Sequence, residues 1–106
     1  MSSATRLEPI HPGEILREEY LEPLGMSMNA LAIALRIPVS RVKAIVDGER
    51  SITADTALRL ARYFDTTPDY WINLQSGYDV RSASKESWRS IEREIIPMAV
   101  TARSRQ

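Results

Sequence analysis

Apolar residues recur at three- and four-residue spacing along most of the chain, which is the period of an amphipathic helix. Caps, prolines and glycines divide this pattern into separate segments. We expect five helices over residues 12–20, 28–35, 39–47, 54–64 and 68–74, and an extra C-terminal helix over residues 85–96. No apolar alternation is long enough to define a strand, so the predicted fold class is all-α.

The fourth segment has the clearest pattern. Its apolar residues obey the i, i+3, i+4, i+7 rule of a core-facing stripe, and they are Ala57, Leu60, Ala61 and Phe64. Thr67 and Pro68 then form an N-cap and first-turn pair that opens the fifth helix. These signals predict a helical hairpin with a short connection.

Residues 75–83 are predicted to be a loop, because they combine Gly77 with small polar residues and carry no apolar stripe. Helical spacing resumes afterwards and stops at Pro97. We therefore expect a flexible N-terminal arm at residues 1–10, a five-helix domain at 11–80, and an extra C-terminal helix and tail at 81–106.

The composition excludes several kinds of chemistry. The chain has no Cys and a single histidine, His11, so a thiolate metal site, a disulfide and a Cys nucleophile are all excluded. No phosphate-binding loop or catalytic motif occurs, and the glutamates at positions 14, 18, 19 and 22 fit a solvated helix face. We expect neither enzyme activity nor a cofactor nor a metal.

The size and hydropathy of the chain indicate one soluble domain. Its 106 residues are 43% hydrophobic, which is enough for a single modest core. No apolar stretch approaches the length that a membrane span requires. We expect no membrane partner and a cytoplasmic location.

Charge is unevenly distributed although the formal net charge is zero. Residues 1–26 hold two Arg against five Glu, whereas residues 36–62 hold six Lys and Arg against three Asp and Glu. Nucleic-acid binding depends on such local concentrations of basic residues and not on the total. The excess of positive charge lies on the segment whose pattern is most typical of DNA binding.

That segment spans residues 27–47 and has the form of a helix-turn-helix. Ser27 caps a short helix, the chain turns near Arg36 and Pro38, and a second helix runs to a stop at Gly48. Ala32 is small, as close packing of the two helices requires. The second helix is therefore predicted to enter the major groove of duplex DNA. We expect the protein to associate with the nucleoid when it is bound to DNA.

We expect the contacts to DNA to fall into two groups. Base edges are expected to meet the start of the second helix, through Val39, Ser40, Lys43 and Ala44 after Pro38. Phosphate contacts are expected from four places, namely Arg41, Arg50, Ser51 and the free amides at Ser27 and Met28. Because so few basic residues lie on this face, we expect a homodimer that reads two half-sites.

Aromatic and apolar residues of the last two predicted helices are candidates for the dimer contact. Trp is enriched at interface hot spots, and the stripe after residue 84 follows the DNA-binding bundle. The predicted dimer interface consists of Tyr70, Trp71, Leu74, Trp88, Ile91 and Ile95.

Five runs of sequence resemble a known family. They are HPGEIL at 11–16, YLEPLG at 20–25, SMNALA at 27–32, DGERSITADTALRL at 47–60 and TPDYWINLQ at 67–75. Residues 9–80 resemble the HigA (VapI-like) antitoxins of the Xre helix-turn-helix class, which have a lambda-repressor-like fold. The resemblance implies a dimeric antitoxin that binds a HigB-type toxin, an mRNA endonuclease, and represses its own operon at operator DNA.

Two positions depart from the pattern of that family. Arg36 stands where the family often has Gly. A residue with a Cβ is therefore expected to adopt a left-handed backbone there, at a cost of about 1 kcal/mol. Pro38 replaces the commoner Ser or Thr cap, so the second helix is expected to begin without a side-chain cap. Base readout is therefore expected to differ from that of relatives.

Three functions remain open at this point. The first is an autorepressing antitoxin, and the second is an Xre transcription regulator without a toxin. The third is a protein-interaction module that has lost DNA binding, a possibility raised by the zero net charge and by the apolar Val39 and Ala44.

Overall fold

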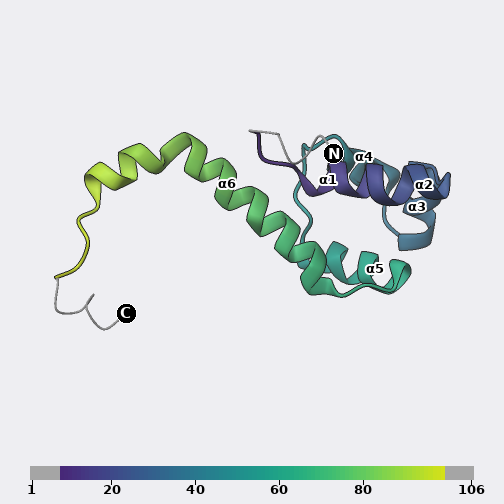
Figure 1. Ribbon diagram of the computed structural model, residues 1–106. Coiled ribbons are helices and arrows are strands. Elements are labelled where there is room, and N and C mark those ends of the chain that lie inside the picture. The colour runs from purple at the N-terminus through teal and green to yellow at the C-terminus, as the bar shows by residue number, and fades with distance from the viewer. Residues whose placement is uncertain (1–7, 100–106) are drawn as a thin grey trace.

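The computed structural model describes residues 8–99. This part of the chain is entirely helical and contains no strand, which confirms the predicted fold class (Figure 1). The elements are α1 (Pro12–Ile15), η2 (Leu16–Leu21), α2 (Glu22–Leu24), α3 (Met28–Leu35), α4 (Val39–Val46), α5 (Ala54–Phe64) and α6 (Pro68–Glu94). Residues 1–7 of the predicted N-terminal arm and 100–106 of the predicted tail lie outside the described residues.

The first helical run is continuous from α1 through η2 to α2, so it extends beyond residue 20, where the predicted segment ends, and passes Pro23. Pro23 has no N–H and leaves a carbonyl without its usual α-helical donor. The run responds by widening into the π-helical turn η2, at whose end the N–H of Glu22 donates to the carbonyl of Arg17, five residues back. Gly25, with φ of 62°, ends the run in the left-handed conformation.

The predicted caps at Ser27 and Thr67 are present, and Thr53 provides a third. The hydroxyls of Ser27, Thr53 and Thr67 accept hydrogen bonds from the third residue of α3, α5 and α6. Arg36 has φ of 61° and ψ of 43°, so the left-handed turn expected after α3 is formed by a residue with a Cβ. Pro38 precedes α4 and provides no side-chain cap, also as expected.

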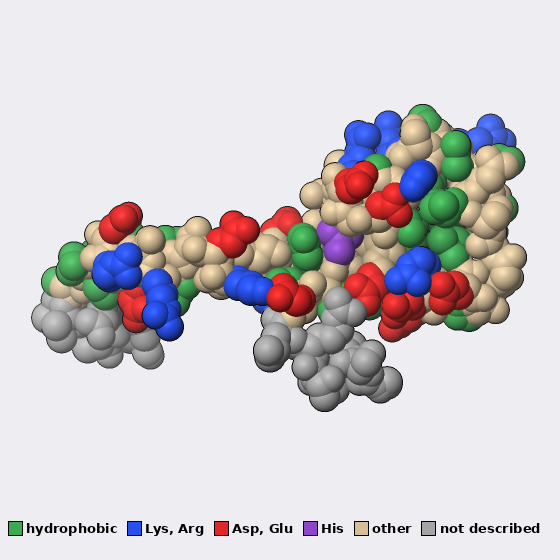
Figure 2. All heavy atoms as spheres, turned by 90° about the horizontal axis from the view of Figure 1, so that it is seen from above, with side chains coloured by type: hydrophobic (Ala, Val, Ile, Leu, Met, Phe, Trp, Pro, Cys, Tyr) green, Lys and Arg blue, Asp and Glu red, His purple; other side chains and the backbone are tan. Residues whose placement is uncertain are grey.

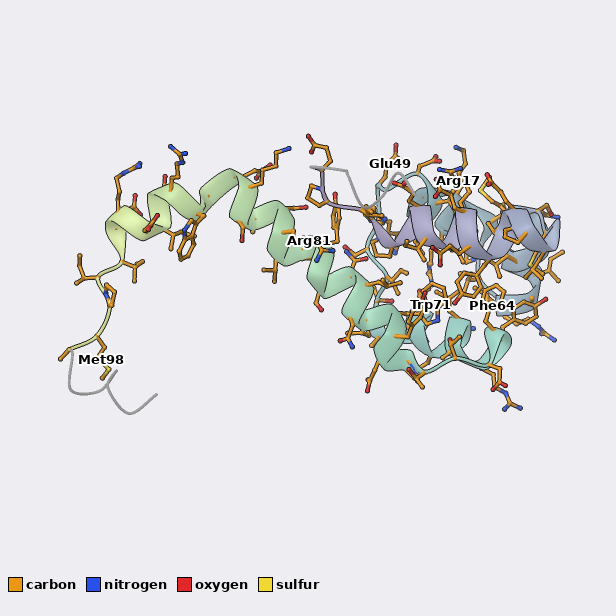
Figure 3. All side chains as sticks on the ribbon, in the orientation of Figure 1. Arg17, Glu49, Phe64, Trp71, Arg81 and Met98 are labelled. Atoms are coloured by element: carbon orange, nitrogen blue, oxygen red, sulfur yellow. The ribbon has the colours of Figure 1, made fainter. Side chains whose placement is uncertain are left out.

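An aromatic cluster joins the first helical run to α5 and α6. Trp71 is fully buried, and its indole N–H donates to the Thr66 hydroxyl at 2.8 Å. The rings of Tyr20 and Phe64 lie 5.1 and 6.3 Å from that of Trp71, centroid to centroid. Figure 3 shows Trp71 and Phe64 in the space between the first helical run and the pair of helices α5 and α6. The cluster fixes the base of α6 on the domain.

The loop predicted at residues 75–83 does not exist, because α6 continues through it as one helix of 27 residues. A single interior glycine costs a helix about 1 kcal/mol, and contacts along this segment offset that cost. Gln75 donates to Asp79 one turn later, and the Tyr78 ring packs edge-on against His11. The expected extra C-terminal helix is therefore the second half of α6.

The second half of α6 projects beyond the domain (Figure 1). The radius of gyration of the Cα atoms is 17.6 Å, whereas a compact chain of this length has about 13 Å. Within residues 8–99, no helix is long and apolar enough to cross a membrane.

Residues 8–11 lie against the middle of α6. Glu8 forms an ion pair with Lys85, and His11 packs on Tyr78. The Nδ1 atom of His11 accepts a hydrogen bond from the N–H of Gly13 at 2.9 Å and so caps α1. Burial lowers the pKa of His11, and the nearby carboxylate of Asp79 opposes this shift. The lone histidine is structural.

Gly13 sets the distance between α1 and α4. A methyl group in place of its hydrogen would lie 2.7 Å from the carbonyl carbon of Ile45 and would overlap the carbonyl oxygen. Both of these atoms belong to backbone, so a side-chain rotation cannot relieve the clash. The two helices thus touch through their main chains, and only glycine permits this.

Gly13→Ala is expected to destabilise the protein by about 3 kcal/mol, because α1 must move away from α4. Urea denaturation measures the change. The matched control is Gly25→Ala, where the added methyl meets no atom within 4 Å and only the left-handed φ opposes it. We expect about 1 kcal/mol there. Equal losses for the two variants would contradict the close contact.

Candidate nucleic-acid interface

The helix α4 has one buried face and one open face. Val42 and Ile45 are each only 1% exposed and hold the helix on the core. Its open face carries the predicted readers of DNA bases. Pro38, Val39, Ser40 and Lys43 are exposed, whereas Arg41 and Ala44 are half-buried.

The N-terminus of α4 leaves backbone donors free for a ligand. Pro38 has an extended backbone, and its carbonyl accepts from Arg41. The N–H groups of Val39 and Ser40 precede the first helical hydrogen bond, and no side chain caps them. An acceptor on DNA can therefore meet these two amides as well as the Ser40 hydroxyl.

Lys43 is held by a neighbour on its own helix. Its Nζ atom lies 2.7 Å from Oδ2 of Asp47, and this hydrogen bond raises the pKa of Lys43. Exposed pairs of this kind contribute little stability. Lys43 can exchange Asp47 for a base acceptor at small cost, but the carboxylate of Asp47 then faces the same surface.

The predicted phosphate contacts flank α4 on both sides. At the start of α3, the Ser27 hydroxyl accepts from Ala30 and so retains its own hydrogen as a donor. Met28 is half-buried there. After α4, Arg50 and Ser51 are exposed in the connection that leads to α5.

Arg41 carries a polar atom without an internal partner. Its Nε is buried and makes no hydrogen bond within the protein, although the side chain as a whole is only half-buried. Buried donors of this kind are uncommon in folded proteins. The remaining guanidinium nitrogens can still reach an anion.

Charged side chains separate over the surface of the domain. In Figure 2, most Lys and Arg of the domain lie at or near its upper edge, whereas Asp and Glu lie both just below that edge and on the lower side, where more of them are visible. Arg17 stands among the acids of the first helical run and forms ion pairs with Glu18 and Glu22. The arrangement leaves one side of the domain better suited to a polyanion.

The structure divides the predicted dimer residues into two groups. Trp71 was wrongly included, because it is fully buried within its own chain. Tyr70 and Leu74 are half-buried and pack on the same core. Trp88, Ile91 and Ile95 are 53, 42 and 64% exposed on the projecting end of α6.

Two supporting residues escaped the sequence analysis. Arg59 of α5 donates from Nη1 to the carbonyl of Leu35 at 2.9 Å and so holds the end of α3 just before the turn at Arg36. Gln75 of α6 bonds the backbone of Ile52, beside Ser51. Contacts over 24 and 23 residues leave no local signal, although Gln75 was visible as the last residue of the TPDYWINLQ run.

No metal-binding group was found among the described residues, where no three His, Cys, Asp or Glu side chains gather. What residues 27–52 present is a protruding helix with free amides, flanked by basic and hydroxyl side chains. This geometry defines a helix-turn-helix protein.

Comparisons with known proteins agree with this class. Residues 18–71 match the HTH_3 helix-turn-helix family. Virulence-associated protein I of Dichelobacter nodosus is 53% identical over 90% of this chain and 86% of its own length. Antitoxin HigA-1 of Vibrio cholerae is 30% identical, and the match covers 94% of this chain and 97% of that protein.

A solved structure is similar over the same range. The Pseudomonas aeruginosa antitoxin HigA with higBA promoter has a TM-score of 0.85 and 48% identity, over 87% of this chain and 100% of that one. The chain therefore belongs to the HTH_3 family, in the group of Xre-like regulators that includes the HigA antitoxins. These are DNA-binding regulators and not enzymes.

Proposed function

We propose that this protein is an antitoxin that binds operator DNA as a homodimer, represses its own operon and neutralises a HigB-type mRNA endonuclease. The observation that carries DNA binding is the exposed start of α4, where two uncapped amides stand beside Ser40 and Lys43. The relative from Pseudomonas aeruginosa, solved with promoter DNA, supports DNA binding by this fold.

In the proposed complex, α4 lies in the major groove and different groups have different tasks. Val39 packs on a thymine methyl, and Ser40 and Lys43 bond base edges. Ser27, Met28, Arg41, Arg50 and Ser51 hold phosphates and so fix the position of α4. Pro38 and Ala44 lie beside the readers, where small and rigid groups allow close approach.

Removing both polar readers is expected to weaken operator binding. Ser40→Ala with Lys43→Ala should lower affinity for the DNA upstream of the protein's own reading frame about 100-fold, because each base contact is worth roughly 1–3 kcal/mol. Gel retardation measures the change. The control is Lys85→Ala, which also removes one positive charge but lies on α6 and not on α4. This variant should bind the DNA normally. Normal retardation by the double variant would exclude this mode of readout.

The proposed dimer forms through the projecting part of α6. Val80, Trp88 and Ile91 follow spacings of eight and three residues and so lie near one line along the helix, and Ile95 continues this stripe as the C-cap that directly follows α6. All four are exposed, and green side chains are visible on this projection in Figure 2. A second copy of the same stripe is a suitable cover, because a two-fold contact requires a self-complementary surface.

Trp88→Ala is expected to weaken the dimer at least about 30-fold, since central Trp residues in interfaces are worth about 2 kcal/mol or more. Sedimentation equilibrium measures the dissociation constant. Ile33→Ala is the matched control, because Ile33 is 67% exposed on α3 and lies outside the stripe. A Trp88 variant that dimerises as tightly as the unaltered protein would place the interface elsewhere.

Toxin neutralisation is the second activity that we propose, and it is supported by relatives that are named as antitoxins. The toxin then binds on surface that the α6 stripe and α4 leave open. A stand-alone transcription regulator is the competing function, and it has no toxin gene beside its own.

Co-expression is expected to separate these two functions. A neighbouring reading frame should encode a basic, ribonuclease-like protein of about 90–110 residues, the size of a single domain. Its expression should arrest growth, and co-expression of this protein should restore growth and yield a complex on gel filtration. Ser40→Ala with Lys43→Ala should still rescue growth. Absence of such a toxin would favour the stand-alone regulator.

A further inference from the structure

The connection between α4 and α5 carries two of the proposed phosphate contacts, and it has no regular structure of its own. Arg50 and Ser51 are exposed, whereas the next residue, Ile52, is 3% exposed. Ile52 stands just outside α5, whose cap is Thr53, so no helical carbonyl is available to its N–H. A buried N–H needs an acceptor from elsewhere.

Gln75 of α6 supplies that acceptor. Its Oε1 atom accepts from the N–H of Ile52 at 2.8 Å, and its Nε2 atom donates to Oδ1 of Asp79 at 3.0 Å. Gln75 is 5% exposed, and among the described residues only it and Thr56 are buried polar side chains. The carboxylate of Asp79 can only accept, so it takes the NH2 group and aims the carbonyl of Gln75 at Ile52.

The same stretch of α6 holds the connection from its other end. The ring of Tyr78 packs on His11, at a centroid distance of 4.8 Å. His11 in turn lies against Gly48, where an added Cβ would come within 3.8 Å of the imidazole. One turn of α6, from Gln75 to Asp79, therefore contacts the end of the segment that follows α4 directly, and it reaches the beginning of that segment only through His11.

We propose that Gln75 is a positioning residue for operator binding, whose side-chain amide ties the phosphate-contacting segment Arg50–Ile52 to the helix that carries the dimer stripe. This inference rests on the proposed function. Gln75 touches no DNA and acts through the backbone of Ile52, which places Ser51 and Arg50. Because α6 is continuous, the same helix holds this segment and carries the stripe proposed to bind the second copy of the chain.

The inference also gives a physical reason for a glutamine at this position. Leucine fills a similar volume but cannot accept from Ile52. Glutamate accepts from Ile52, yet its second oxygen faces the carboxylate of Asp79 and is repelled. Asparagine at position 79 provides an NH2 group that can donate to that glutamate. The two changes together therefore rebuild both hydrogen bonds, but residue 79 is now the donor in the second one and residue 75 the acceptor.

The test compares Gln75→Leu, Gln75→Glu and Gln75→Glu with Asp79→Asn in the full-length chain. The DNA is a duplex from upstream of the protein's own reading frame, and affinity is measured over a range of salt concentrations. Gln75→Leu should bind about tenfold more weakly. The slope of log K against log salt should become shallower by about 0.9 for each phosphate that the variant no longer binds. Gln75→Glu should be weak, and Asp79→Asn should restore most of its affinity and slope.

Two controls separate positioning from loss of fold. Leu21→Ala removes a buried side chain of the first helical run and destabilises the protein. At a temperature where it remains folded, its salt slope should be unchanged. Amide hydrogen exchange at Ile52 should accelerate in Gln75→Leu and return toward normal in the double variant, and sedimentation should show that every variant is dimeric.

The outcomes are distinct. If Gln75→Leu is folded and dimeric but keeps its affinity and slope, Gln75 has no positioning role, while the proposed function stands. A tenfold loss with an unchanged slope, or with no recovery in the double variant, also overturns the inference, because a general loss of stability then explains it. If the unaltered protein does not bind its upstream DNA, the proposed function is wrong, and this inference, which rests on it, is wrong as well.

Discussion

The recognition helix depends on how closely other helices can approach it. α4 has eight residues, which is too few for a helix to be stable by itself in water. Its stability comes from Val42 and Ile45, buried on one side, and from Gly13, which lets the main chain of α1 touch the last turn of α4. With both anchors on the inner face, the outer face is free to carry polar groups that contribute nothing to folding.

Because of this division, the polar groups of the candidate DNA surface form few strong interactions within the free protein. Lys43 is occupied by Asp47 in an exposed pair that is easily exchanged, and the amides of Val39 and Ser40 have no side-chain cap. Pro38 contributes to this state, because a Ser or Thr cap would accept from one of the first amides of α4. Groups left unsatisfied at the surface in this way are available to a ligand.

Local signals accounted for much of the fold, and contacts between distant residues account for the rest. Ser27, Thr53 and Thr67 were predictable as caps, since each bonds an amide three residues away. The left-handed backbone of Arg36 was expected from the resemblance to a family that often has Gly at this position. The continuity of α6 could not be predicted from local signals, because Gly77 and its small polar neighbours favour a loop over a helix. Their helix depends on Tyr78 meeting His11, 67 residues earlier in the chain. For the same reason Trp71 was misplaced, since the periodicity of one helix cannot tell which side meets Tyr20 and Phe64.

A continuous α6 changes what the C-terminal half of the chain can do. A loop at residues 75–83 would have let the exposed stripe move independently of the domain. As one helix, α6 carries the stripe about 26 Å from Trp71 to Trp88, at about 1.5 Å per residue, with a fixed rotation about its axis. Pairing two copies through such a helix sets both the distance and the relative orientation of their α4 helices. Half-sites on DNA lie at multiples of a helical turn, so a rigid helix makes the proposed dimer selective for spacing, which a flexible link would not.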